Sequence, residues 1–92
     1  MQVHLYATFR LLAGVKTLTL DLPAGTSVRQ LVAAVTAQAP ALKRHWLDAD
    51  GEIHAHVHGF VNGNDVALLP GGWDSPLQPD DSLDFFPPVA GG

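Results

Sequence analysis

Hydrophobic and polar residues alternate near both ends of the chain, and a longer period replaces the alternation between them. Apolar residues at every second position predict a first strand over residues 3–9. Leucines alternate with threonines and an aspartate over residues 17–22, which predicts a second strand. Only a short segment with a glycine, residues 11–14, connects them. The two strands are therefore expected to pair as a hairpin.

A helix is predicted over residues 27–39. Ser27 and Gln30 have the spacing of a capping box, and Pro40 ends the helical pattern. One apolar face follows the helical period, at Val28, Leu31, Val32 and Val35. This face is expected to pack on the strands.

The second half of the chain returns to strand-forming patterns. Residues 40–51 are a polar crossover in which Leu42, Trp46 and Leu47 have the spacing of one helical turn. Residues 53–61 predict a third strand. The Asn-Gly pair that follows is a strong hairpin signal, with the return beginning at residues 65–67. After several turns, residues 83–86 predict a short last strand.

The element order is therefore strand, strand, helix, strand, short strand, strand. This order indicates an α+β fold with a mixed β-sheet and one main helix packed across it. The ubiquitin-like β-grasp has this order. We predict a β-grasp domain over residues 1–86 and an extended, flexible C-terminal Gly-Gly tail over residues 87–92.

The composition and charge of the chain limit the classes of function that it can have. The 92 residues suffice for one domain, and 47% hydrophobic with 15% charged residues argue against disorder. The net charge of −4 and the lack of a basic run argue against nucleic-acid or anionic-membrane binding. Cysteine is absent, which excludes a thiol nucleophile. Neither a membrane span nor a signal peptide is predicted, so we expect a cytoplasmic protein.

The last residues combine two prolines with small side chains. Prolines lack a backbone donor and favour an extended chain, and glycines allow a backbone to enter a narrow channel. The reactive group of such a tail is the carboxylate of Gly92, which needs ATP-dependent adenylation to become an electrophile. The chain has no glycine-rich phosphate loop, so the activating enzyme would be a partner. The alternative is a frayed terminus without function.

Several blocks of the chain resemble a known family, the MoaD/ThiS group of ubiquitin-like sulfur carriers, and within it the small subunit of molybdopterin synthase. The most specific block is the final one, which is similar to the family's Phe-Pro-Pro-Val-x-Gly-Gly. The matching blocks are Val3–Arg10, Asp21–Leu31, Phe60–Val66, Asp74–Leu77, Asp80–Leu83 and Phe85–Gly92. The resemblance, from the first of these blocks to the last, spans essentially the entire chain.

The resemblance implies that an E1-like adenylyltransferase activates Gly92 and that a sulfur donor enzyme converts it to a thiocarboxylate. The sulfur would pass to the molybdopterin synthase large subunit during molybdenum cofactor biosynthesis. Gly91 and Gly92 are then the reactive site. The expected partner contacts are Phe86, Pro87, Pro88, Val89 and Ala90. The chain alone is expected to be non-catalytic and to bind no cofactor, because the partner enzyme uses the ATP.

Two other functions compete with this one. Residues 50–57 also resemble small prokaryotic ubiquitin-like modifiers, which use the same terminus to form bonds with lysines of target proteins. A carrier for tRNA thiolation is a related alternative. The third hypothesis, from a different class, is a non-catalytic β-grasp interaction module with an inert tail.

Three histidines, His54, His56 and His58, alternate in the predicted third strand. We favour a solvated face over a metal site, because no further ligand is placed beside them, and no metal is predicted. Phe86 should face outward if Leu83 and Phe85 face the core. It is then either a partner anchor or covered by a loop residue such as Trp73.

Aspartates precede the tail in sequence, at residues 74, 80, 81 and 84. They form either a solvated loop or an acidic rim for a basic partner. Trp46 and Trp73 are expected in or at the edge of the core.

Overall fold

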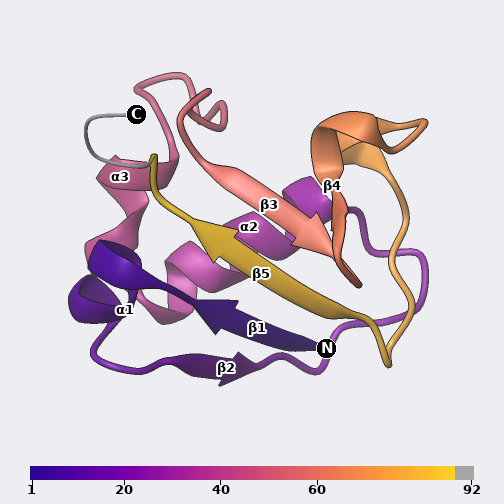
Figure 1. Ribbon diagram of the computed structural model, residues 1–92, viewed down its shortest axis with the longest axis horizontal. Helices are drawn as coiled ribbons and strands as arrows, with labels where there is room; N and C mark the ends of the chain where they lie inside the picture. Colours follow the sequence, from indigo (N-terminus) through magenta and orange to yellow (C-terminus); the bar gives the residue numbers. More distant parts are fainter. Residues whose placement is uncertain (89–92) are drawn as a thin grey trace.

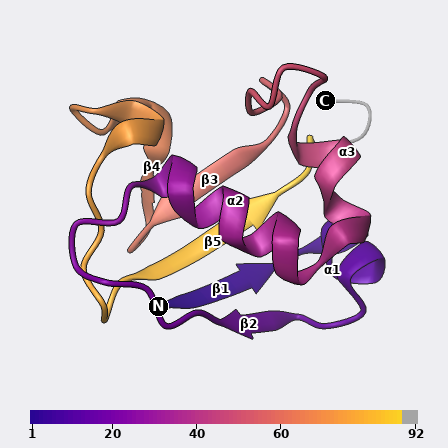
Figure 2. The same ribbon diagram turned by 180° about the vertical axis from the view of Figure 1, so that it is seen from behind.

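The computed structural model describes residues 1–88 and contains a five-stranded sheet with α2 packed across one face (Figures 1 and 2). The strand order is β2-β1-β5-β3-β4. β1 and β5 are parallel and the other pairs are antiparallel. The strands are β1 Gln2–Leu5, β2 Thr17–Thr19, β3 His58–Val61, β4 Asn64–Asp65 and β5 Ser82–Phe86. The predicted mixed sheet with one main helix is confirmed.

The main helix begins and ends as its sequence predicts. α2 spans Val28–Gln38, and the side chains of Ser27 and Gln30 each accept the other residue's backbone N–H, at 3.1 and 2.9 Å. The other helices are α1 Ala7–Ala13 and α3 Lys43–Trp46, with short 3₁₀ turns η1 Pro40–Leu42, η2 Val66–Leu68 and η3 Gly72–Asp74. In residues 1–88, no helix has the length and apolarity needed to cross a membrane.

The core lies between α2 and the sheet. The apolar face of α2 is completely buried, as are Leu83 and Phe85 of β5. The ring of Trp46 lies 4.5 Å from that of Phe85 and 5.3 Å from that of Phe9 between centroids. Trp46 is therefore a core residue, as predicted, and Trp73 packs against the edge of the core.

The prediction of a strand up to Phe9 is wrong, because β1 ends at Leu5 and α1 follows at once. Phe9 is buried and Leu12 and Ala13 are half-buried, which is helical spacing. Gly14 ends α1 with a left-handed φ of 77°. β1 and β2 do pair antiparallel, but a helix connects them, and β2 is shorter than the predicted residues 17–22.

The third strand is also shorter than predicted, because residues 53–57 turn before β3 begins. Leu47 and Ile53 form an isolated bridge, closing a small loop of their own. In that loop the Asp48 carboxylate accepts the backbone N–H groups of residues 50 and 52, at 2.8 and 3.0 Å. The N–H of Val57 then donates to the carbonyl of His54 at 3.1 Å. These local hydrogen bonds replace a strand ladder.

The Asn62-Gly63 hairpin is confirmed. Both residues have positive φ, 50° and 85°, as a tight primed turn requires. The Asn62 amide also donates to Asp81 and its oxygen accepts the N–H of Ser82, both at 2.9 Å. The return strand β4 is only two residues long, and residues 66–68 form η2 instead of continuing it.

Candidate functional site at the end of the last strand

The end of β5 is fixed from both sides. Leu5 of β1 lies opposite Phe85, and His58 of β3 lies opposite Phe86. The N–H of Tyr6 donates to the carbonyl of Phe85 at 3.3 Å. Pro87 and Pro88 follow and cannot donate backbone hydrogen bonds, so the ladder cannot extend through their nitrogens. The chain therefore leaves the sheet from a defined point, the end of its central strand (Figure 1).

Phe85 and Phe86 face opposite sides of the sheet. Phe85 is completely buried under α2, as predicted, whereas Phe86 is half-buried on the outer face. The Phe86 ring stacks on Tyr6, with centroids 4.2 Å apart and planes at 10°. Phe60 meets it edge-on at 5.7 Å and 89°. We call Tyr6, Phe60 and Phe86 the outer aromatic cluster.

A carboxylate orients the phenol of this cluster. The Tyr6 hydroxyl donates to Oδ1 of Asp84 at 3.1 Å. The pKa of Tyr6 is raised above 10.0. The largest cause is desolvation of the phenol, followed by this hydrogen bond and by the negative charge of Asp84. Tyr6 still exposes 39% of its surface. The cluster thus exposes an aromatic face with one fixed polar group, a composition typical of interface anchors.

Trp73 does not cover Phe86. A Cβ added to Gly59 would lie 3.1 Å from Phe85 and 3.2 Å from Trp73, so both rings lie on the inner side of β3. The suggested loop cover for Phe86 is therefore wrong, and Tyr6 and Phe60 flank it instead.

The predicted site residues divide into two groups. Phe86 lies in the cluster, Pro87 is half-buried and Pro88 is exposed. Val89, Ala90, Gly91 and Gly92 lie outside the described residues.

Sequence reasoning missed Tyr6 and Phe60 as neighbours of Phe86. Tyr6 lies just after β1 and continues the outward alternation of Gln2 and His4, and this alternation was the available signal.

The histidines do not share one strand face, because only His58 belongs to β3. His54 and His56 lie in the preceding turn, and their rings stack with centroids 4.8 Å apart. Nε2 of His56 lies 2.9 Å from the carbonyl oxygen of His45. In the part of the chain that the structure describes, no group of three or more potential ligands is arranged to hold a metal ion.

The acidic rim beside the tail is also wrong. Asp81 lies just before β5, at the end away from the tail, and accepts the N–H of Gln78 at 2.8 Å. Asp74 pairs with Arg29 at 2.9 Å. Only Asp84 lies within the strand that carries the tail, and its oxygen accepts from Tyr6.

Comparisons with known proteins agree with this geometry. The chain matches the ThiS family over residues 3–92. It is 30% identical to small archaeal modifier protein 3 of Haloferax volcanii over 92 residues, covering all of this chain and 98% of the relative.

Two solved structures have the same fold over nearly their whole length. The crystal structure of SAMP1 from Haloferax volcanii superposes with a TM-score of 0.88 at 27% identity, covering 99% of this chain and 97% of that one. A putative molybdopterin converting factor, subunit 1, from Pyrococcus furiosus gives 0.73 at 33% identity, with 96% and 95% covered. The resemblance to ubiquitin-like sulfur carriers and the β-grasp fold are confirmed, and the chain belongs to the ThiS family.

Proposed function

We propose that this protein carries an activated acyl group on Gly92. An E1-like adenylyltransferase would adenylate the terminal carboxylate, and a sulfur nucleophile would convert it to a thiocarboxylate. The observation that carries the proposal is the junction at Phe86. There, a strand held on both sides gives way to two prolines, and in the sequence only small residues and Gly91-Gly92 follow Val89.

The chemistry requires two substitutions. A carboxylate oxygen of Gly92 attacks the α-phosphorus of ATP, and pyrophosphate leaves. Hydrosulfide, or a donor enzyme's equivalent of it, then attacks the carbonyl carbon, and AMP leaves with the carboxylate oxygen. The net change on the chain is one oxygen replaced by sulfur. ATP binds to the partner enzyme, and this chain supplies no residue to it.

The residues of the tail have separate roles in this proposal. The outer aromatic cluster anchors the partner surface, and Pro87 and Pro88 keep the following backbone extended. Val89 and Ala90 add little bulk, so the tail can enter a narrow active site, and the glycines allow the closest approach to the nucleotide.

The first candidate for the use of the sulfur is transfer to the molybdopterin synthase large subunit. The 33% identity to the putative molybdopterin converting factor subunit supports it. This role, like tRNA thiolation, belongs in the cytoplasm, where ATP is available.

The second candidate is a protein modifier. The similarity of the full chain to small archaeal modifier protein 3 supports it. In this case a lysine ε-amine attacks the activated carbonyl of Gly92, the activating group leaves, and an isopeptide bond forms.

Intact-mass spectrometry tests the shared step. The chain is incubated with ATP, an E1-like adenylyltransferase and hydrosulfide, beside a known carrier as positive control. We expect a gain equal to sulfur replacing oxygen, localised to Gly92, and no gain in a chain that lacks Gly92. An unchanged mass beside an active control would contradict the proposal and favour an inert interaction module.

The two candidates are then separated in cells. Glycyl remnants of this chain on lysines of other proteins indicate a modifier. Loss of molybdopterin on deletion of Gly92, without such remnants, indicates the carrier.

A further inference from the structure

The positive charges of this acidic protein gather at one end. Of its five Lys and Arg residues, four are exposed residues on or beside α1 and α3. Arg10 belongs to α1, Lys16 precedes β2, and Lys43 and Arg44 begin α3. Figures 1 and 2 show α1, α3 and the start of β2 at the end of the sheet where β5 terminates. We call these four residues the basic end.

These charges are not neutralised locally. The fifth cation, Arg29, has two ion pairs, with Glu52 and Asp74, each at 2.9 Å. Within residues 1–88, none of the four cations of the basic end has a carboxylate within 4.0 Å. Their field therefore projects into solvent.

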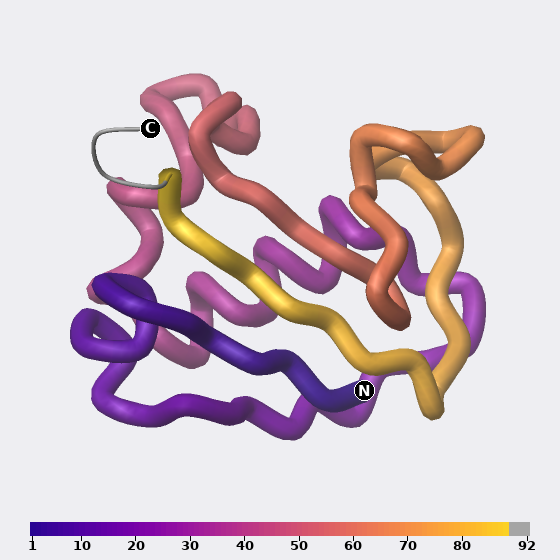
Figure 3. Tube along the Cα trace, viewed as in Figure 1, coloured from indigo at the N-terminus to yellow at the C-terminus, as the bar shows by residue number. Residues whose placement is uncertain are grey.

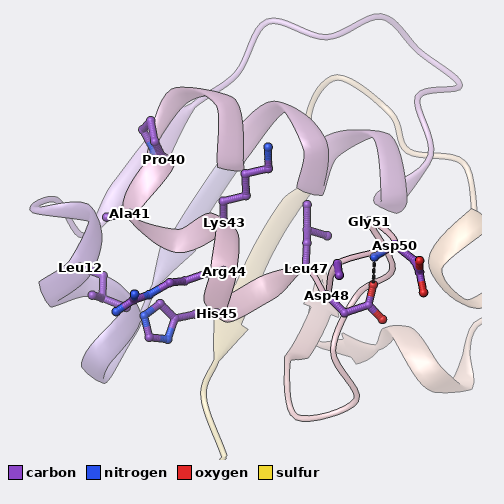
Figure 4. A pocket seen from close by; sticks show the side chains of 11 residues that line it. Leu12, Pro40, Ala41, Lys43, Arg44, His45, Leu47, Asp48, Asp50 and Gly51 are labelled. Atoms are coloured by element: carbon purple, nitrogen blue, oxygen red, sulfur yellow. Dashed lines mark hydrogen bonds between the residues drawn. The ribbon is translucent and has the colours of Figure 1, made fainter.

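The carboxylates lie elsewhere. Asp21, Asp65, Asp74, Asp80 and Asp81 follow β2, end β4 or precede β5, and so lie toward the opposite end of the sheet. Three more lie in residues 48–52, and Asp84 bonds to Tyr6. A shallow groove of about 840 Å³ over α3 separates the cations of α3 from the carboxylates of residues 48–52. Figure 4 shows Arg44 and His45 on one side of it, with Asp48 and Asp50 on the other.

Exposed apolar side chains interrupt the basic end. Leu11 exposes 79% of its surface and Val15 exposes 44%. Both line a depression with Arg10 and Lys16. Leu11 and Val15 therefore add an apolar area to the basic end, rimmed by Arg10 and Lys16.

The basic end continues into the outer aromatic cluster. Tyr6 lines a second depression together with Arg10 and Lys16, and its ring stacks on Phe86. One continuous surface thus extends from Phe86, at the end of β5, across α1.

We propose that the basic end, together with the exposed side chains of Leu11 and Val15, docks on an acidic surface of the activating enzyme beside the channel that takes the tail. This inference rests on the proposed function. The net charge of −4 would repel an acidic partner as a whole. The separation of charges within the protein, however, favours approach with the basic end facing that partner. A long nucleic acid fits less well, because the boundary of the patch carries Asp48 and Asp50.

Three double substitutions, two in the basic end and one control elsewhere, test the surface in an adenylation assay. R10Q/K16Q and K43Q/R44Q each remove two positive charges, so the net charge falls from −4 to −6. The control A24E/Q78E adds two negative charges at exposed positions before α2 and before β5, and also gives −6. Circular dichroism and thermal unfolding confirm that each variant is folded.

We expect each basic-end variant to lower kcat/KM for adenylation by about 3- to 10-fold at low salt, with kcat nearly unchanged. The difference should shrink at about 0.5 M salt, where screening is strong. The control should stay within about 2-fold of the unmodified chain, since its added charges are distant.

Three results would overturn the proposal. Equal losses in the control would mean that only net charge matters. Unchanged rates in both basic-end variants would mean that this end does not contact the enzyme. Unchanged adenylation combined with lost binding to a single-stranded RNA would assign the surface to nucleic acid. If the unmodified chain itself is not adenylated, the proposed function fails together with this inference.

Discussion

Phe85 and Phe86 are adjacent in the chain but belong to two different surfaces of one sheet. Phe85 is buried between α2 and the sheet and contacts Trp46, whereas Phe86 stacks on Tyr6 and is only half-buried. The inner ring contributes to folding because its whole surface leaves water. The outer cluster keeps part of its surface available. One strand thus contributes both to the buried core and to a partly exposed aromatic surface.

The strongest test of this comparison is Phe85→Ala. A completely buried ring would be replaced by a cavity beside Trp46. We expect the free energy of unfolding to fall by about 3–5 kcal/mol, measured by urea denaturation. A loss below about 1 kcal/mol would mean that the inner face is not tightly packed.

Phe86→Ala should reduce adenylation more than it reduces the stability of the fold. The stacked contact with Tyr6 is partly exposed, so the free energy of unfolding should fall by only about 1 kcal/mol. If the outer aromatic cluster anchors a partner, kcat/KM for adenylation should fall by about 10-fold. Phe86→Leu, which keeps an apolar side chain without stacking, is the matched control. A mutant as unstable as Phe85→Ala would remove the distinction between the two faces.

A smaller effect concerns the pKa of Tyr6, which is the only tyrosine in the chain. Asp84→Asn removes a negative charge beside the phenol and should lower this pKa toward 10.0, leaving the desolvation contribution. Ultraviolet absorbance during an alkaline titration measures it directly. A pKa unaffected by the substitution would mean that the hydroxyl does not contact Asp84 in solution.

The raised pKa of Tyr6 also determines the direction in which the stability of the fold changes with pH. The pKa of Tyr6 is higher in the folded chain than in the unfolded chain. Its contribution to stability is therefore complete below about pH 10 and is lost as the pH rises through the folded-state pKa.

The smallest effect is expected for Arg29→Gln, which breaks the ion pairs to Glu52 and Asp74. All three side chains are more than one-third exposed, so solvent screens the interaction. The free energy of unfolding should fall by less than about 1 kcal/mol, and the difference should shrink in high salt. A larger loss that is insensitive to salt would point to packing by the Arg29 stem.

Features that depend on a few adjacent residues were predictable. The capping box of Ser27 and Gln30 and the primed turn at Asn62-Gly63 are local, and both have the geometry that the sequence indicates. Helix α1 was missed because Leu5 to Phe9 also fits a strand pattern. Burial of Phe9 against Trp46 outweighs the local preference for strand.

The candidate site was only half predictable for the same reason. The tail is adjacent in sequence to Phe86 and could be recognised with it. Tyr6 and Phe60 become its neighbours only through the register of β5 with β1 and β3, which no local pattern specifies. The charge separation likewise depends on how α1 and α3 come together.

The parallel pairing of β1 and β5 has a mechanical consequence. The two central strands are neighbours, yet the chain starts at one end of the sheet and β5 terminates at the other (Figure 3). A pull on Pro88 against Met1 therefore loads the hydrogen bonds between these strands together, in shear, instead of opening them one by one. A tail drawn into a partner enzyme, or attached to a protein under tension, would thus load several hydrogen bonds at the same time.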